Sequence, residues 1–251
     1  MKVLVTFAVD WELRPWRRVR SFRPAPGDGR VFHAQIAGSD IKAILTGVGS
    51  ENAIQTLRAC FEEAPDLCII SGLAGGLKSE YRSGDVLVAR TIFREAGAES
   101  LSSDASLLGL AVRCGAKAVE SFISVSKVVR TSKEKSALGA FADAVDMESF
   151  AVMEEMARWD VPSVAIRAIA DEVELDLMCD FDRTLDTSGR VRMTQVLGQV
   201  ARAPKELWPL VKFGVVSSRA ASALARYLDA YIDSLGEPKA SLDLSAQQVA
   251  K

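Results

Sequence analysis

The stretch AVDMESFAVMEEMARWDVPSVAIRAIAD, residues 144–171, decides the fold class. A helix is predicted over 150–159, and Pro162 stops it because proline cannot continue a helix. Residues 164–169 form a short, mostly apolar run with β-branched side chains, which indicates a buried strand. A helix therefore leads directly into a strand. Acidic residues flank this unit on both sides: Asp146, Glu148 and Asp171.

The same alternation extends outward along the chain. Further strands are predicted over 3–9, 31–36, 41–45, 67–71, 86–89 and 122–129, and the second and third of these form a hairpin. The strand over 67–71 is expected to end in a glycine-rich turn over 72–76. Further helices are predicted over 51–63, 107–114 and 133–142. Strands that alternate with helices favour an α/β fold with a central mixed, largely parallel sheet and helices on both sides.

The C-terminal third has a different texture. An acidic, irregular stretch over 172–190 precedes helices predicted over 193–201 and 204–235. We therefore divide the chain into a domain over 1–180, a helical extension over 181–235, and a polar tail over 236–251 without regular structure. Four basic residues recur every seven positions along the long helix: Lys205, Lys212, Arg219 and Arg226. This helix is predicted to pack on the domain or a second subunit, and the alternative is that it rests on an anionic membrane surface.

Composition narrows the classes of function. The 251 residues carry 31 basic and 33 acidic side chains, so no net field would recruit nucleic acid. The sequence shows no signal peptide and no apolar run near the ~18 residues of a membrane span. Its four scattered cysteines indicate reduced thiols and a cytoplasmic protein. His33 is the single histidine, so neither a histidine-based nucleophile nor the usual zinc site is expected. Catalysis would fall to carboxylates, arginines and backbone amides.

Acidic residues recur where predicted strands end. Asp10 and Glu12 follow the first strand, and Asp171 follows the strand over 164–169. Ligands of open α/β sheets bind outside the carboxyl ends of the strands, so these acids are expected to converge on one pocket. The turn TGVGSEN resembles a dinucleotide fingerprint, but Asn52 stands where the third glycine belongs, which makes an NAD-type oxidoreductase the weaker alternative.

Five motifs in order resemble one family. AVDWE (8–12), TGVGSENA (46–53), ISGLAGGL (70–77), GDVLVA (84–89) and the stretch over 144–171 are similar to the purine nucleoside phosphorylase and methylthioadenosine nucleosidase superfamily. SKVVRTSKEK (126–135) and the stretch over 189–214 are most similar to its hopanoid-associated branch. The resemblance implies a three-layer nucleoside phosphorylase-like fold with a C-terminal helical extension. It also implies a homo-oligomer that cleaves the N-glycosidic bond of a purine nucleoside, with adenine as the expected base.

The resemblance also implies roles for individual residues. Asp171 would protonate purine N7 as a general acid, and Glu12 would orient or deprotonate an attacking water. Glu148 would accept hydrogen bonds from the ribose hydroxyls, and Met147 would pack on the sugar. The remaining expected substrate contacts are Val128 and Val129 at the base, and Gly47, Gly49 and Gly75 where backbone approaches the nucleophile and sugar. No metal and no cofactor are expected, with phosphate as a possible co-substrate.

Three departures from the family pattern leave alternatives open. Leu73 replaces a serine or threonine near the ribose and phosphate, Ile70 replaces a phosphate-binding arginine of some relatives, and Ala170 replaces the usual serine before the acid. Arg14, Arg17 and Arg18 could contact phosphate, so phosphorolysis and hydrolysis both remain. Adenosylhopane is the substrate that the hopanoid-associated branch implies. The alternative from another class is a nucleoside-binding regulatory protein without turnover.

Overall fold

The computed structural model describes residues 1–61, 63–95, 99–176 and 207–235, with the backbone alone over 207–213. Its strands are β1 (Lys2–Phe7), β2 (Arg23–Ala25), β3 (Asp28–Ile36), β4 (Ser39–Leu45), β5 (Leu67–Gly76), β6 (Val86–Arg94), β7 (Ser100–Ser102), β8 (Lys117–Ser124), β9 (Ala144–Asp146) and β10 (Ser163–Asp171). Its helices are α1 (Asp10–Val19), α2 (Ser50–Cys60), α3 (Ala105–Arg113), α4 (Ser132–Leu138), α5 (Ser149–Arg158) and α7 (Leu207–Leu235).

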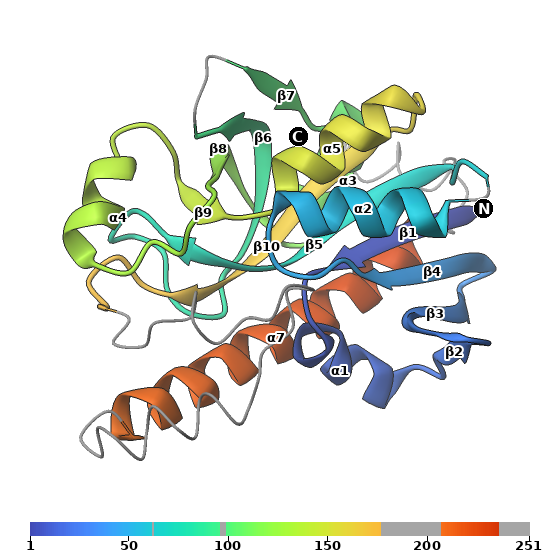
Figure 1. The fold of residues 1–251 in the computed structure, drawn as a ribbon, viewed down its shortest axis with the longest axis horizontal. Helices are drawn as coiled ribbons and strands as arrows, with labels where there is room; N and C mark the ends of the chain where they lie inside the picture. Colours follow the sequence, from blue (N-terminus) through green and yellow to red (C-terminus); the bar gives the residue numbers. More distant parts are fainter. Residues whose placement is uncertain (62, 96–98, 177–206, 236–251) are drawn as a thin grey trace, which may run out of the picture.

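All strands join one mixed sheet (Figure 1). Along its main path the order is β10-β6-β8-β9-β5-β1-β4-β3-β2. Because β10 also pairs with β5, the strands β5, β10, β6, β8 and β9 close into a ring, from which β1, β4, β3 and β2 extend. The sheet thus combines a barrel-like half with an open half, and β5 belongs to both.

The parallel strands at the centre position the site. β1 pairs in parallel with β4 and β5, and β10 pairs in parallel with β5. Their carboxyl ends therefore lie at one edge of the sheet, which is where ligands bind in folds of this kind. Glu12 follows β1 at this edge and Asp171 ends β10, whereas Glu148 follows β9, which pairs antiparallel with β5.

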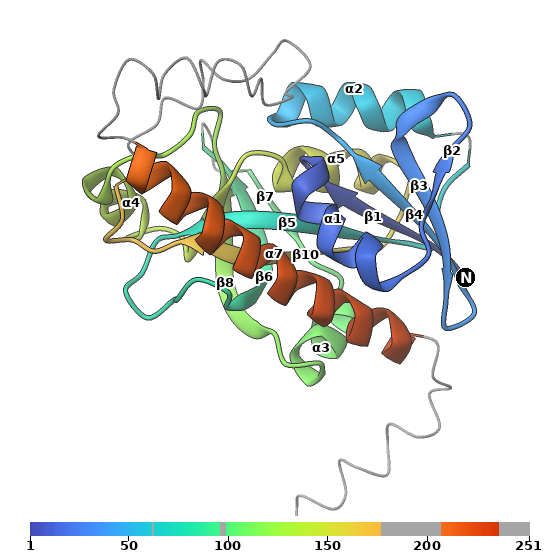
Figure 2. The same ribbon diagram turned by 90° about the horizontal axis from the view of Figure 1, so that it is seen from below.

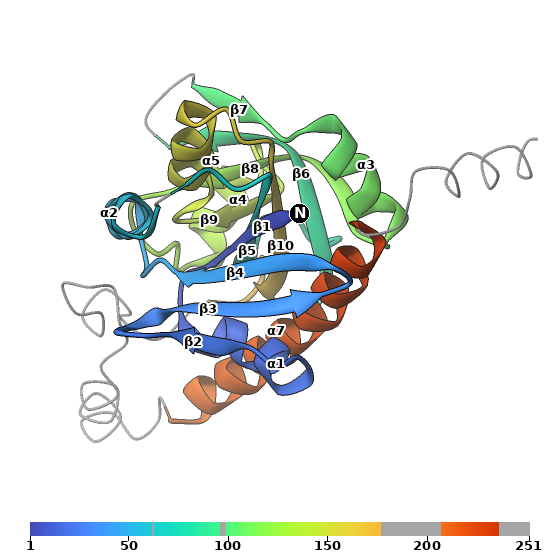
Figure 3. The same ribbon diagram turned by 90° about the vertical axis from the view of Figure 1, so that its right-hand side faces the viewer.

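Helices cover both faces of the sheet, so the predicted three-layer α/β fold is confirmed. α2 and α5 lie on one face, and α1 and α7 lie on the other, as Figure 3 shows. The first core is built around Leu57, Ile70 and Met156, and the second around Trp16, Val5 and Leu228. The apolar residues of the central strands thus pack against helices on both faces, which accounts for the runs read as buried strands.

α7 packs along the sheet and along α1, as Figure 2 shows. The Arg20 guanidinium group after α1 binds Asp229 through two hydrogen bonds of 2.6 and 3.0 Å, and Trp16 Nε1 donates to the same carboxylate. Tyr227 and Tyr231 donate their hydroxyl groups to carbonyl oxygens of α3. From residue 217 onward the inner face of α7 is core, as the packing interpretation predicts.

The membrane interpretation rests on the other side of this helix. Arg219 and Arg226 are exposed there, as is Val215, while the side chains before residue 214 and Lys205 lie outside the described part. Within the described ranges, the structure contains no helix with the length and apolar character needed to traverse a bilayer.

Several predicted element boundaries are wrong. β5 continues through the glycines of 72–76, which were expected to form a turn, because these residues pair with β10 and β9. β8 ends at Ser124, so Val128 and Val129 follow the strand. The segment after β1 forms the helix α1, which was not predicted, and neither were β2, β7 and β9. The predicted helix over 193–201 and the tail over 236–251 lie outside the described residues.

The packing of α7 generates a stability prediction. Leu228 is fully buried, so Leu228→Ala should lower the free energy of unfolding by about 2–5 kcal/mol through lost burial and a residual cavity. The exposed Arg226 two residues earlier is the matched control, and Arg226→Ala should stay within about 0.5 kcal/mol of the unmodified protein. Urea unfolding followed by circular dichroism measures both. Equal, small losses would contradict a core role for this helix.

Candidate active site

Arg167 is the centre of a buried charge cluster at the carboxyl edge of the sheet. It lies on β10 and is 1% exposed. Its Nη2 forms a 2.6 Å ion pair with Asp146 Oδ2 and lies 3.6 Å from Glu148 Oε2. Nε and Nη2 also contact the Ser149 hydroxyl group, and Nη1 donates to the carbonyl oxygen of Ser71. Every nitrogen of the guanidinium group therefore has a partner.

Asp146 is fixed from the other side by hydroxyl groups. Ser124 at the end of β8 donates to Asp146 Oδ1 at 2.5 Å, and Ser149 donates to Oδ2. The backbone N–H of Ser149 points at the same carboxylate. With these bonds and Arg167, Asp146 is a structural anion that holds the arginine.

Glu148 joins the turn after β9 to the turn before α2. Its Oε1 accepts a 2.7 Å hydrogen bond from the backbone N–H of Gly49, which adopts a left-handed φ of 91° at the start of α2. Ser50 donates its hydroxyl group to the carbonyl oxygen of Met147 at 3.0 Å. Burial raises the pKa of Glu148 to about 7; Arg167 opposes this rise. This carboxylate therefore changes charge near neutral pH.

Glu12 lies in the first turn of α1 and is also buried. Its Oε2 accepts from the backbone N–H of Ala8 at 2.9 Å and of Val9 at 3.3 Å, and its Oε1 accepts from that of Leu73 at 2.9 Å. Burial raises the pKa of Glu12, against the effect of Arg167 and these N–H groups. Three backbone donors thus hold this carboxylate between β1 and β5.

Gly72 lets Glu12 and Arg167 meet on β5. A Cβ atom at this position would lie 2.4 Å from Arg167 Nη1 and 3.2 Å from both carboxylate oxygens of Glu12. Its φ of 139° is also one that other residues rarely adopt. Gly72 was not among the three glycines, Gly47, Gly49 and Gly75, that were predicted to contact the ligand.

Asp171 lies at the end of β10, beside Gly75 of β5. It is 7% exposed, and Lys135 Nζ of α4 forms a 2.5 Å ion pair with its Oδ2. A Cβ atom at Gly75 would lie 3.3 Å from Oδ2 and 3.1 Å from Val145 Cγ1. Burial raises the pKa of Asp171, and Lys135 opposes this rise. Gly75 and Gly72 are three residues apart, which separates the acid from the Arg167 cluster by roughly 10 Å along β5.

A small apolar cluster lies beside the acid. Val145 and Leu77 belong to it, and the half-buried Met147 and Val129 pack against it. Val128 is half-buried next to Val129 in the segment after β8. Gly47, with φ of 82°, donates its N–H to the carbonyl oxygen of Ala8 in the turn after β4. The predicted site residues therefore come from neighbouring segments at one edge of the sheet.

Two charged residues of this site, Arg167 and Lys135, were not predicted. Arg167 was part of a motif but received no role, and Lys135 was read as an ordinary helix residue. An arginine inside the apolar run of β10 was an available signal, since an unpaired charge is not buried in a sheet. Lys135 gave none, because the same helix also carries the exposed Lys133, and spacing alone does not distinguish the two.

The positions that bear on phosphate binding are two departures from the family pattern, Ile70 and Leu73, and the three arginines of α1. Ile70 is fully buried under α2 and α5, and Leu73 offers only its backbone N–H to Glu12. Arg17 forms an ion pair with Asp10 and lies 4.5 Å over the Phe32 ring. Arg14 and Arg18 are exposed on α1.

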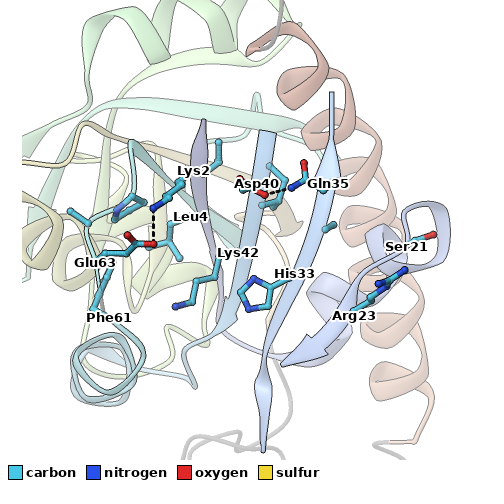
Figure 4. A pocket seen from close by; sticks show the side chains of 15 residues that line it. Lys2, Leu4, Ser21, Arg23, His33, Gln35, Asp40, Lys42, Phe61 and Glu63 are labelled. Carbon is cyan, nitrogen blue, oxygen red and sulfur yellow. Dashed lines mark hydrogen bonds and ion pairs between the residues drawn. The ribbon is translucent and has the colours of Figure 1, made fainter. Parts of the chain in front are cut away.

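A pocket of about 660 Å³ lies at the opposite, amino-terminal edge of β1 and β4. Figure 4 shows its charged side chains, with Lys2 paired to Glu63 and Asp40 to Gln35. His33 is exposed there on β3, remote from the acids. The predicted chemistry has no counterpart in this pocket.

The sequence of the chain is similar to a known protein family and to curated enzymes. Residues 2–202 match the family model of the phosphorylase superfamily. The chain belongs to this superfamily. Within it, a 5′-methylthioadenosine/S-adenosylhomocysteine nucleosidase of Shewanella sediminis is 28% identical over 180 residues, which are 62% of this chain and 78% of the relative. The enzyme of the same name from Bacillus thuringiensis subsp. konkukian is 26% identical over 214 residues, covering 74% and 92%.

Solved structures share the fold of this chain. A Helicobacter pylori nucleosidase with butyl-thio-DADMe-Immucillin-A has a TM-score of 0.71 at 18% identity, covering 93% of this chain and 98% of the other. A native futalosine hydrolase structure of the same species has a TM-score of 0.69 at 18% identity, with the same coverage. The superfamily and the fold predicted from the motifs are thus confirmed.

The close approach at Gly72 generates a second prediction. Gly72→Ala should displace Arg167 or Glu12 and strain the backbone, and we expect a loss of about 1–3 kcal/mol in the free energy of unfolding. Gly29→Ala is the matched control, because a Cβ atom there meets nothing within 4 Å. Urea unfolding compares the two variants. A Gly72→Ala protein as stable as the control would show that the cluster tolerates a side chain at this position.

Proposed function

We propose that this protein is a nucleosidase that hydrolyses the N-glycosidic bond of an adenine nucleoside. The observation that carries the proposal is the convergence of Glu12 and Glu148 on Arg167, with Asp171 further along the same strand pair. The curated relatives, named as nucleosidases of 5′-methylthioadenosine and S-adenosylhomocysteine, support the same chemistry.

The charge balance of the cluster suits the reaction. Asp146 neutralises Arg167, which leaves the carboxylates of Glu12 and Glu148 in excess. Departure of the base makes the ribose cationic, and fixed negative groups in a buried site stabilise such a charge strongly. In the proposed reaction, Glu148 accepts hydrogen bonds from the ribose hydroxyls, and Met147 packs against the sugar.

Bond cleavage and proton transfers then balance. The water oxygen bonds to C1′ and gives a proton to Glu12. The electron pair of the C1′–N9 bond moves to the purine, and Asp171 gives a proton to N7, so that a neutral base leaves. Val128 and Val129 would border the base, and Gly47, Gly49 and Gly75 would let the ligand approach the backbone.

Two side chains, at positions where relatives bind phosphate, favour water over phosphate as the nucleophile. Ile70 is buried in the core and Leu73 has an aliphatic side chain whose backbone N–H already donates to Glu12, so neither side chain can bind a phosphate anion. Phosphorolysis, with phosphate as co-substrate, is the alternative. A nucleoside-binding protein without turnover is the runner-up of another class, which the buried acids with raised pKa do not favour.

The finer features remain predictions. Adenosylhopane is the substrate that the hopanoid-associated resemblance implies, and the exposed Arg219 and Arg226 would then face an anionic membrane. Binding to anionic liposomes at low salt, compared with the Arg219→Glu and Arg226→Glu double variant, tests that contact. A cytoplasmic location, a homo-oligomer, and the domain division at residues 180 and 235 are predicted in the same sense.

The substrate is tested by base release from 5′-methylthioadenosine, S-adenosylhomocysteine, adenosine, futalosine and adenosylhopane, with and without phosphate. Hydrolysis yields free sugar at the same rate in both conditions, whereas phosphorolysis yields the sugar 1-phosphate and stops without phosphate. Binding of these nucleosides without base release would favour the regulatory alternative.

Asp171→Asn should lower kcat for adenine release by about 10²–10⁴-fold, because an amide cannot give a proton to N7. Asp160→Asn, an exposed turn residue with φ of 56°, is the matched control and should leave kcat unchanged. Steady-state kinetics with a nucleoside that the unmodified protein cleaves measures both. Near-normal turnover of Asp171→Asn would remove the proposed acid.

Glu148 predicts a pH dependence. With a pKa of about 7, it is a carboxylate above that pH and a weaker acceptor below it, so kcat/KM should fall as the pH drops through about 7. Glu148→Gln should lower kcat/KM and abolish this acid-side fall, whereas the exposed Glu51→Gln should keep it. Because the contact is to ribose hydroxyls, the Glu148→Gln substitution should lower kcat/KM less for a 2′-deoxyribonucleoside than for the corresponding ribonucleoside. Equal, small losses for both sugars would exclude the contact.

A further inference from the structure

Lys135 is a fully buried lysine whose ammonium group contacts the proposed general acid. Its side chain is 0% exposed, and its Nζ lies 2.5 Å from Asp171 Oδ2. The same nitrogen donates to the carbonyl oxygens of Glu172 at 3.0 Å and Leu175 at 2.8 Å. An ammonium group has three N–H donors, and all three are used here. The group is therefore held at one position.

Helix α4, which carries Lys135, has its own stabilising hydrogen bonds that do not involve the lysine. α4 begins with a capping box, in which Thr131 accepts from the backbone of Glu134 and Glu134 accepts from that of Thr131. Lysine is among the residues least often fully buried, and it is buried only when paired. The formation of α4 therefore does not explain why Lys135 is buried against Asp171.

Other charged groups near Asp171 face elsewhere. Glu172 turns to Arg82 and to the N–H of Ser83, and Asp176 accepts from the N–H of Ser132. Asp143, before β9, is engaged by Lys78 and Tyr81. From β5 and β9, Gly75 and Val145 approach Asp171, and neither ionises. Among the described residues, Lys135 is the cation that contacts this carboxyl group.

We propose that Lys135 is a positioning residue for the reaction, whose ammonium group orients the Asp171 carboxyl group and stabilises the carboxylate that forms as Asp171 gives its proton to the purine. The inference rests on the proposed function. Proton transfer to N7 leaves a negative charge on a buried aspartate, and an ammonium group 2.5 Å away favours that charged form. Lys135 gives up no proton itself, so the balance of the reaction is unchanged.

The two effects on Asp171 oppose each other, which defines the test. Burial raises the pKa of Asp171, and Lys135 lowers it. Without Lys135 the acid should therefore keep its proton to higher pH and release it less readily to the purine. A nearby opposite charge shifts a carboxyl pKa by about 1–3 units. The optimum of a bell-shaped profile is the mean of two pKa values, so it should rise by about half that shift.

The experiment measures kcat/KM against pH for Lys135→Met, Lys135→Arg and the unmodified protein, with the nucleoside that the unmodified protein cleaves. Lys135→Met should lower kcat/KM at the optimum about 10-fold or more and move the optimum upward by about 0.5–1.5 pH units. Lys135→Arg retains the charge and should keep the optimum. Lys78→Met is the matched control, because it removes a 2.5 Å ion pair with Asp143 and leaves Asp171 untouched.

Direct titration of Asp171 gives a readout independent of turnover. Carboxyl ¹³C NMR, with Asp171 assigned by its loss in Asp171→Asn, should show a higher pKa in Lys135→Met than in the unmodified protein. If Lys135→Met fails to fold, Lys135→Gln carries the same test, since its amide can still donate to the Glu172 and Leu175 carbonyl oxygens.

The outcomes separate the two proposals. A lower rate with an unchanged optimum and an unchanged Asp171 titration would make Lys135 a structural residue and overturn the inference, while nucleosidase activity of the unmodified protein stands. Absence of base release by the unmodified protein from every nucleoside tested would overturn the proposed function itself. The expected result is that the pH optimum and the pKa of Asp171 rise in Lys135→Met. Both should keep their original values in Lys135→Arg and Lys78→Met.

Discussion

A single buried arginine imposes the order of this site. Arg167 is removed from water at the centre of a sheet, which is tolerated only when its charge and all its N–H groups have partners. Asp146 supplies the charge, Ser149 and the Ser71 carbonyl oxygen supply acceptors, and a glycine at 72 supplies the room. Four elements, β5, β9, β10 and α5, are therefore fixed relative to one another before any ligand is considered. The two remaining carboxylates take positions that backbone N–H groups define.

The packing of the C-terminal helix contributes to the same geometry from a distance. Glu12 reaches β5 only if α1 lies flat on the sheet, and α1 is held there by Trp16 in the core and by Arg20 bound to Asp229 of α7. α7 thus lies beside α1 in the helical layer that positions Glu12. A segment that differs in composition from the rest of the chain is in this way part of the support of the site.

Short-range patterns revealed most of the fold, and long-range partners explain what they did not. Apolar runs located the central strands within a few residues, because both faces of those strands are covered. The glycines of 72–76 were read as a turn, since a sequence does not show that β10 pairs with them. The converging acids followed from strand order and family motifs. Lys135 was out of reach, because its partner lies 36 residues away and nothing local distinguishes a buried lysine from an exposed one.

The two halves of the site differ in charge along β5. Around Gly72 the carboxylates exceed the cations, and around Gly75 one carboxyl group faces one buried ammonium group. In glycosidic cleavage, positive charge develops on the sugar while negative charge develops on the base and passes to the acid that protonates it. Groups already fixed in place stabilise such charges without the reorganisation that water would need. A nucleoside lying along β5, sugar toward Gly72 and base toward Gly75, would meet each developing charge with its opposite, and the reversed orientation would meet like charge at the sugar end.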